Sequence, residues 1–310
     1  MLRLAVPDLV SNSYFPAAAA VELGFFKKEG LEVSLELMFP VDRSYRALRD
    51  REIDIVAGSA HSAAAAFPNY QGAKLLCSQA QGMYWFLVMH SDLGVARGDL
   101  SALRGKRIGA APWVDLGLRG LLIEAGLDPA KNDIDIVPVP SPPTQSINFG
   151  LNAARALQDR QIDGFWANGM AAEVATLGGF GSVVLDVRRG EGPPAAFGFT
   201  FASIVVRDDL VSAEPECAGA IVRAIVGAQD AMKADPSLAT RVGLALFPRS
   251  EAELIARLIE RDLPYYDHRI RRETIAQMSE FLRRMSLTNA DLDYDDVVAA
   301  GTSAFQKARP

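Results

Sequence analysis

A glycine-bounded segment near the N-terminus, Gly24 to Leu31, most constrains how this chain folds. Before it, Pro16 can open a helix because its missing N–H is one that a first helical turn leaves unpaired, and Gly24 can end that helix. Near the end of the segment, Gly30 permits a positive φ. Residues 32–37, which follow it, alternate between polar and apolar side chains as a half-buried strand does. An apolar strand at residues 2–6 stands in front of the helix, so the pattern predicts a β-α-β unit.

The loop between that first strand and its helix carries the first candidate ligand-binding residues, Asn12, Ser13 and Tyr14. In open parallel sheets, ligands bind outside the carboxyl ends of the strands, where helix N-termini also offer free N–H groups. A buried strand at residues 53–57 runs into a second loop of this kind. We therefore expect Ser59, Ala60 and His61 at the same edge of the sheet.

The middle of the chain repeats this order of strand, loop and helix. Strands are predicted at residues 108–110, 134–139 and 162–166, and the candidate ligand-binding residues beside them are Trp113, Asp115, Ser141, Trp166 and Asn168. The two tryptophans, like Tyr14, could offer a flat apolar face to a ligand. Asp115 and Glu173 would bind an amine if they faced the ligand, but helix capping and the helix dipole explain these carboxylates equally well.

Six segments carry a resemblance to a known family: GFFKKEGLEV, LRDREIDIVAGS, DLSALRGKRIGA, ALQDRQIDGFWANGMAAEVA, FASIVVRDDLV and LRRMSLTNADLDYDDVV. They resemble the substrate-binding proteins of ABC transporters for nitrate, sulfonates, taurine and thiamine precursors. The resemblance implies an α/β fold of the two-lobed, type II periplasmic-binding-protein kind, with a mostly parallel, helix-flanked sheet in each lobe. Lobe 1 would comprise residues 1–92 and 199–310, and lobe 2 residues 93–198, with two crossings between them.

The same resemblance implies a function in uptake. A protein of this family captures a small organic molecule in a cleft between its lobes, and the membrane permease subunits of the transporter recognise the closed form. Helix N-termini at the sheet edges suit a carboxylate, sulfonate or phosphate group without Arg or Lys, so we expect an anionic ligand. We expect a monomer with no cofactor and no nucleic acid partner.

Two other functions stay open at this stage. Desulfinases and pyrimidine synthases resemble this fold and use a catalytic histidine at the place of His61, but their reactive cysteine or Cys-rich segment has no counterpart here. A Ser-His-acid triad could be drawn from Ser11 or Ser13 with His61 and Asp115, although the chain has no G-x-S-x-G elbow. The other alternative is a cytosolic ligand sensor.

The composition argues against several further classes of protein. The chain of 310 residues is 49% hydrophobic and 23% charged, which is typical of a globular protein, and its net charge of −6 with no basic stripe argues against nucleic acid. No apolar run approaches the roughly 20 residues of a membrane helix. No signal-peptide pattern is visible, so we expect a periplasmic or cell-surface protein if a signal was removed, and a cytoplasmic one otherwise. The scattered cysteines and histidines predict free thiols and no metal site.

Overall fold

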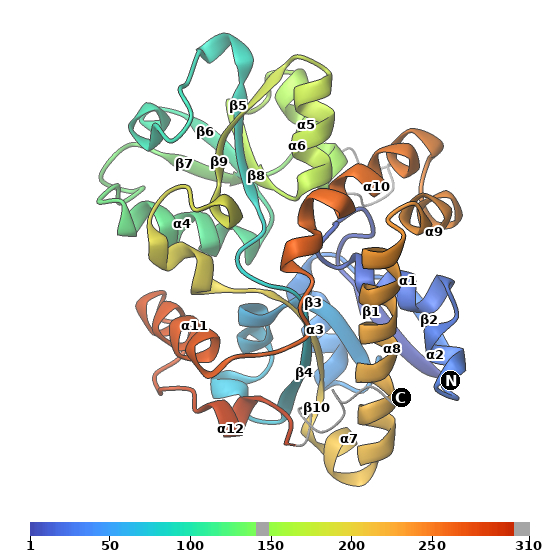
Figure 1. Ribbon diagram of the computed structural model, residues 1–310. Helices are drawn as coiled ribbons and strands as arrows, with labels where there is room; N and C mark the ends of the chain where they lie inside the picture. Colours follow the sequence, from blue (N-terminus) through green and yellow to red (C-terminus); the bar gives the residue numbers. More distant parts are fainter. Residues whose placement is uncertain (141–148, 301–310) are drawn as a thin grey trace. The chain divides into compact units, whose positions relative to one another are not determined.

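The computed structural model describes residues 1–140 and 149–300, which form two compact units (Figure 1). Unit 1 comprises Met1–Gln81 and Thr200–Pro310, and unit 2 is Gly82–Phe199. Each unit contains one five-stranded sheet flanked by helices. Among the described residues, no helix is both long enough and apolar enough to cross a membrane.

The sheet of unit 1 has the strand order β2-β1-β3-β10-β4. Strand β1 is parallel to β2 and β3, whereas β10 runs antiparallel to both of its neighbours, β3 and β4. The strands are β1 (Leu2–Val6), β2 (Val33–Leu37), β3 (Ile55–Ser59), β4 (Ala73–Ala80) and β10 (Ala202–Arg207). The central strand β3 is buried along its whole length, whereas the edge strand β2 is half-buried, as its alternating sequence predicts.

Helices cover both faces of this sheet. The chain leaves β1 on one side to reach β2 and returns past β1 to reach β3, so right-handed connections place the helices before β2 and before β3 on opposite faces. These are α1 (Phe15–Glu22) with the short α2 (Phe25–Lys28), and α3 (Val41–Arg49). The remaining helices are α7 (Asp208–Ala213), α8 (Pro215–Ala234), α9 (Leu238–Leu246), α10 (Arg249–Asp262), α11 (Arg272–Arg284) and α12 (Tyr294–Val297), and the long α8 packs against α1 and β4.

Unit 2 repeats the topology of unit 1. Its strand order is β7-β6-β8-β5-β9, in which β6 is parallel to β7 and β8, and β5 is antiparallel to β8 and β9. The strands are β5 (Phe86–His90), β6 (Arg107–Ala110), β7 (Asp135–Pro138), β8 (Gly164–Ala167) and β9 (Gly181–Asp186). The helices are α4 (Val114–Glu124), α5 (Phe149–Gln158) and α6 (Gly169–Leu177).

The first crossing from unit 1 to unit 2 lies earlier than the sequence predicted. We expected lobe 1 to run to residue 92, but β5 pairs with β8 and β9, so the structure assigns this strand to unit 2. The change of unit takes place within a tight segment at Gly82, whose φ is +70°. A Cβ atom at this position would come within 2.3 Å of the Phe197 ring, so only glycine fits. This boundary was not predictable from the sequence, because the chain passes between the units without a long polar linker.

Local differences from the sequence prediction are small. Gly30 has the expected positive φ of +77°. The residues after Gly24 form the short helix α2 before the chain reaches β2. Asp42 lies in the first turn of α3, and Pro40 occupies the cap position. Ser59 is the last residue of β3 rather than a loop residue.

Candidate functional site

Two neighbouring parallel strands of unit 1, β1 and β3, bring the first predicted residues to one sheet edge. Asn12, Ser13 and Tyr14 follow β1, and Ser59, Ala60 and His61 end or follow β3. All six are buried, at 4% exposure or less. The structure therefore brings this set to the carboxyl edge of one sheet, which is where ligands bind in open α/β folds.

The loop after β1 is held by the C-terminal part of unit 1. The Nδ2 group of Asn12 donates to the Asp262 carboxylate at the end of α10, and Tyr266 donates its hydroxyl to the Asn12 carbonyl. Asp262 also accepts from the Nε group of Arg261 at 2.9 Å. The amide nitrogen of Asn12 thus serves the scaffold. Sequence reasoning missed Asp262 because 250 residues separate the two partners and no spacing signal connects them.

The helix that follows this loop also differs from the expectation. We expected the first turn of α1 to leave its N–H groups free for a ligand. The N–H of Ala17 donates instead to the side-chain carbonyl of Gln79 on β4, at 3.1 Å. Gln79 is itself fixed, because its Nε2 group donates to the Ser203 carbonyl at 3.0 Å. Part of the N-terminal charge of α1 is therefore neutralised inside unit 1.

The loop after β3 contains a chain of buried side-chain contacts. The Nδ1 atom of His61 lies 2.9 Å from Oγ1 of Thr200, and its Nε2 atom lies 3.4 Å from Oγ of Ser62. Ser62 Oγ in turn lies 2.6 Å from Ser59 Oγ. The His61 ring packs edge-on against Phe281 with ring centroids 5.7 Å apart. The His61 ring is thus held by contacts at both ring nitrogens and by its packing against Phe281.

Two tyrosines fix the backbone of the same loop. Tyr45 donates its hydroxyl to the Ser59 carbonyl at 2.8 Å, and Tyr70 donates to the Ala60 carbonyl. Burial raises the pKa of both phenols, so each stays protonated and can act as a donor at any physiological pH. The positions of Ser59 and His61 are therefore well defined.

Some polar atoms at this edge have no partner. Among the described residues, neither the Ser11 hydroxyl nor the Oδ1 atom of Asn12 has a hydrogen bond, although both atoms are buried. A buried polar atom without a hydrogen bond costs about 1–3 kcal/mol, so native proteins rarely keep one without a reason. These two atoms are the strongest indication of a ligand in unit 1.

In unit 2, the parallel neighbours β6 and β8 bring a second set of predicted residues to one edge. Trp113 precedes α4 and is half-buried, with a φ of +69° that is rare for a side chain of this size. Asp115 accepts from the Nε group of Arg119 at 2.8 Å, so this carboxylate is engaged within α4. Asn168 caps α6 by accepting from the Ala171 N–H at 3.1 Å.

Trp166, the last large side chain of β8, belongs to an aromatic cluster. Its ring lies 6.2 Å from that of Trp85, which lies 4.7 Å from Tyr84. The guanidinium of Arg188 stands 5.3 Å above the Tyr84 ring and is itself buried. The Nε1 donor of Trp166 has no partner among the described residues, and the ring is fully buried.

Sequence reasoning placed Tyr84 and Trp85 in lobe 1 and gave Arg188 no role. An aromatic pair directly before a strand was the available signal. Ser141, the remaining predicted residue, lies outside the described residues.

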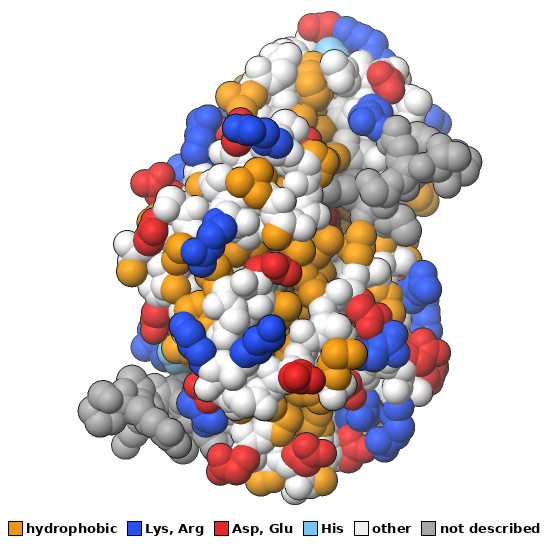
Figure 2. Space-filling view, turned by 90° about the vertical axis from the view of Figure 1, so that its right-hand side faces the viewer, with side chains coloured by type: hydrophobic (Ala, Val, Ile, Leu, Met, Phe, Trp, Pro, Cys, Tyr) orange, Lys and Arg blue, Asp and Glu red, His pale blue; other side chains and the backbone are white. Residues whose placement is uncertain are grey.

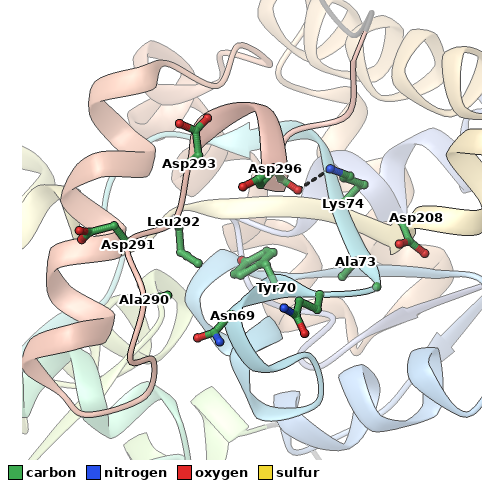
Figure 3. Close-up of a pocket in the computed structure, with 12 residues that line it drawn as sticks. Asn69, Tyr70, Ala73, Lys74, Asp208, Ala290, Asp291, Leu292, Asp293 and Asp296 are labelled. Carbon is green, nitrogen blue, oxygen red and sulfur yellow. Dashed lines mark hydrogen bonds between the residues drawn. The ribbon is translucent and has the colours of Figure 1, made fainter.

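A separate pocket of about 450 Å³ lies at the opposite edge of the sheet of unit 1 (Figure 3). Asp208 follows the end of β10 and Ala73 begins β4, so this pocket is at the amino edge of the parallel strands. Asp293 and Asp296 also line it, and Lys74 donates to the Asp296 carbonyl there. None of the predicted ligand residues line this pocket.

The described part of the chain holds no cluster typical of a metal centre, and the face seen in Figure 2 shows no continuous basic patch. No group of three or more His, Cys, Asp or Glu residues could hold a metal ion within residues 1–140 and 149–300. Figure 2 shows Lys and Arg side chains interspersed with Asp and Glu over one face, without a continuous basic patch. Burial raises the pKa of the Cys77 thiol, which makes it a poor nucleophile.

No family model and no curated protein sequence matches the chain. Solved structures do match it over nearly the full length. A protein from Bordetella bronchiseptica superposes with a TM-score of 0.76 at 19% identity, covering 98% of this chain and 96% of its own. The alkanesulfonate-binding protein of Xanthomonas axonopodis pv. citri, bound to MOPS, gives 0.70 at 14% identity, covering 97% and 96%.

The chain has the type II periplasmic-binding-protein fold. It is the fold of the substrate-binding proteins of sulfonate and nitrate ABC transporters. The fold also supports an enzyme. A mutant of the desulfurization enzyme DszB, in complex with biphenyl-2-sulfinic acid, superposes with a TM-score of 0.63 at 16% identity, covering 98% of both chains.

Proposed function

We propose that the protein captures one small organic anion in a cleft between its two lobes and delivers it to the membrane subunits of an ABC importer. The observation that carries this proposal is a pair of buried polar groups at the carboxyl edges of the two sheets that have no hydrogen-bond partner in the described part of the chain. They are the Ser11 hydroxyl in unit 1 and the Trp166 Nε1 group in unit 2. Both groups are hydrogen-bond donors, so a ligand with acceptor oxygens would satisfy them.

The chemistry of the two edges supports an organic anion. Hydroxyl groups at the edge of unit 1 and the indole N–H in unit 2 suit sulfonate or carboxylate oxygens. The aromatic side chains of Trp113 and Trp166 would cover an apolar part of the same molecule. Asn12, Ser13, Tyr14, Ser59, Ala60 and His61 from unit 1, with Asp115 and Asn168 from unit 2, complete the proposed lining. The fold's known use in sulfonate-binding proteins supports the same assignment.

Thermal melting with a ligand panel tests this function. A ligand at 100 times its dissociation constant adds about 2.7 kcal/mol to the folded state, which is a readily measured shift. The panel comprises methanesulfonate, benzenesulfonate, benzoate and nitrate, and the recovered compound is analysed for chemical change. A shift with the compound recovered intact supports a binding protein. No shift with any of these anions contradicts the proposed ligand class.

Matched variants locate the site. Ser11→Ala removes a hydroxyl at the sheet edge that has no partner among the described residues, whereas Ser212→Ala removes an exposed hydroxyl on α7 that donates to the Asp208 carbonyl. We expect only the first to reduce the ligand-induced shift. Equal shifts in both variants would remove Ser11 from the site.

An enzyme on the same scaffold is the second candidate. One observation favours it: the His61 Nε2 atom lies 3.4 Å from the Ser62 hydroxyl in a fold that DszB shares. An altered compound recovered from the panel, with turnover lost in both His61→Gln and Ser62→Ala, would establish this candidate. Turnover unaffected by either variant would exclude these two residues as its catalytic groups.

The partners and location follow from the proposed function. Permease subunits in a membrane would recognise the ligand-bound form, and the protein would act as a monomer in the periplasm or at the cell surface. Sedimentation of the purified protein with and without ligand measures the oligomeric state directly.

A further inference from the structure

Four side chains in unit 1 form a continuous buried chain in the order Thr200, His61, Ser62, Ser59. The successive distances are 2.9 Å, 3.4 Å and 2.6 Å. All four residues are at most 1% exposed. Because buried polar groups in native proteins make the hydrogen bonds open to them, the direction of each bond in this chain can be worked out from its ends.

Thr200 sets the direction at the first end. Its Oγ1 atom accepts from the His61 backbone N–H at 3.4 Å, and its other contact is with the His61 Nδ1 atom at 2.9 Å. A hydroxyl has one hydrogen to donate, and Nδ1 is the acceptor that the structure offers it. Thr200 therefore donates to Nδ1. This bond leaves Nδ1 without a proton, so the His61 ring is neutral and carries its proton on Nε2.

The remaining directions follow from that tautomer. Since Nε2 carries the proton, it donates to the Ser62 hydroxyl oxygen. Ser62 then donates its own hydrogen to Ser59 Oγ, the next atom in the chain. Within the described residues, the structure gives the Ser59 hydroxyl hydrogen no acceptor, because the side-chain contact of Ser59 is the bond that it accepts from Ser62. The series of hydrogen bonds therefore ends in the Ser59 hydroxyl, which acts as a donor.

That donor lies at the sheet edge that also carries an unpaired hydroxyl. Ser59 is the last residue of β3, and Ser11 follows the neighbouring parallel strand β1. The Ser11 hydroxyl is 1% exposed and has no partner among the described residues. Two donor hydroxyls at one edge suit a group that offers several acceptor oxygens and no hydrogens, which is the chemistry of an ionised sulfonate or carboxylate.

We infer that Thr200 is a positioning residue that fixes His61 as the neutral Nε2–H tautomer, and that the chain Thr200–His61–Ser62–Ser59 thereby presents the Ser59 hydroxyl as a donor to an oxyanion of the ligand. This inference rests on the proposed binding function and assigns its anion-recognising groups in unit 1. In this arrangement His61 acts on the oxyanion through the Ser62 and Ser59 hydroxyls, and it is the Ser59 hydroxyl that donates to the oxyanion. The arrangement also makes His61 a donor toward Ser62, which is the wrong direction for a general base.

The first test does not depend on finding a ligand. Nitrogen-15 NMR of histidine-labelled protein reports the tautomer of each of the three histidines, and the His61 signal is assigned as the one lost in His61→Gln. We expect a neutral Nε2–H ring in the wild type and in Thr200→Ser, which keeps the hydroxyl. Thr200→Val keeps the shape but removes the donor, so we expect that tautomer preference to be lost. A protonated ring or an Nδ1–H ring in the wild type overturns the inference.

The second test measures binding of benzenesulfonate, methanesulfonate and benzoate by calorimetry. Loss of one well-placed donor to a charged oxygen weakens binding roughly tenfold, so we expect about this loss in Thr200→Val and in Ser59→Ala, and none in Ser212→Ala. Thr200→Ser should restore the affinity, which shows that a Thr200→Val loss does not come from misfolding. Unchanged affinity in both Thr200→Val and Ser59→Ala overturns the role of the chain in binding.

The two tests separate the inference from the proposed function. If none of the three anions binds to the wild type, the proposed ligand class fails, and the anion half of the inference fails with it. The assignment of Thr200 as the residue that sets the His61 tautomer is still decided by the NMR result. If an anion binds and only the tautomer differs from the expected one, the proposed function stands and the inference fails.

Discussion

The carboxyl edges of the two sheets share a topology but differ in chemistry. In unit 1, the loops after β1 and β3 present hydroxyl, amide and imidazole groups. In unit 2, the corresponding edge beside β6 and β8 carries Trp113 and Trp166, with Trp85 and Tyr84 packed behind the latter. The repeated strand order therefore fixes where the loops lie, whereas the residues in the loops set the chemistry of each edge. Polar side chains predominate at the edge of unit 1, and aromatic rings predominate at the edge of unit 2.

The two edges also differ in how far their polar groups are hydrogen-bonded within the fold itself. Asn12 and His61 are held by Asp262 and Thr200, so much of the polar surface in unit 1 is scaffold. In unit 2, packing of rings holds Trp166, and its N–H has no hydrogen-bond partner within residues 1–140 and 149–300. All three tryptophans lie in unit 2 and both cysteines in unit 1. Tryptophan fluorescence and thiol labelling therefore report the two units separately.

The largest expected effect is on the stability of unit 2. Trp166→Ala removes a fully buried ring and leaves a cavity, which costs about 3–5 kcal/mol. We expect urea unfolding followed by tryptophan fluorescence to shift to much lower urea. Trp113→Ala, at a half-buried position, is the control and should shift far less. Equal shifts would mean that the aromatic cluster does not support unit 2.

A smaller loss of stability is expected at the edge of unit 1. Asn12→Ala removes the Nδ2 donor that serves the buried Asp262 carboxylate, which costs about 1–3 kcal/mol. Thiol labelling of the buried Cys77 in β4 measures this loss, because labelling requires unit 1 to open. If Cys77 is labelled no faster in Asn12→Ala, the bond to Asp262 contributes nothing.

Ser11→Ala and Trp166→Phe compare the two unpaired donors directly. Each removes one donor and keeps most of the packing, and a lost donor to a charged ligand weakens binding about tenfold, or ~1.4 kcal/mol. Without ligand, Ser11→Ala should not destabilise the protein, since the hydroxyl it deletes has no partner among the described residues. Binding measured for both variants shows whether the two edges serve one ligand. A loss in only one of them would assign the ligand to that unit.

The smallest effect is a pH dependence confined to unit 1. Loss of hydration lowers the pKa of the half-buried His268 below its usual value, with Lys233 and Arg269 acting in the same direction and the carboxylates of Asp267 and Asp230 opposing it. The folded state thus favours neutral His268. Above the ordinary pKa near 6.5, His268 is neutral in both the folded and the unfolded chain and the free energy of unfolding keeps its full value. The free energy of unfolding decreases as the pH falls from there through the lowered pKa, because the unfolded chain binds the proton more readily. His268→Gln should flatten this fall in Cys77 protection, and an unchanged profile would exclude His268 as its source.

The predictable part of the site was its location. Alternating and apolar strands, each followed by Ser, Asn, Trp or Gly before a helix, correctly predicted which segments reach the carboxyl edge of each sheet. The type II periplasmic-binding-protein fold was also predicted, from short segments that resemble its members. Local rules sufficed because strand, turn and helix preferences act over a few residues.

The partners of these residues were not predictable in the same way. Asp262, Thr200 and Gln79 each reach the edge from a distant part of the chain, and each bond depends on the tertiary fold. Arg188 was overlooked because no local pattern in the sequence indicates that its guanidinium is buried over Tyr84. The early chain crossing at Gly82 likewise depends on the fit of the Phe197 ring.

The order of strands in unit 1 has a consequence for the growing chain. Strand β10 lies between β3 and β4 in the sheet, yet it is synthesised after the whole of unit 2. Until the ribosome has passed Arg207, β4 has no neighbour through which to join its own sheet. Unit 2, with all five strands between Gly82 and Phe199, is complete earlier. The half of the protein that begins the chain is therefore the half that finishes folding last.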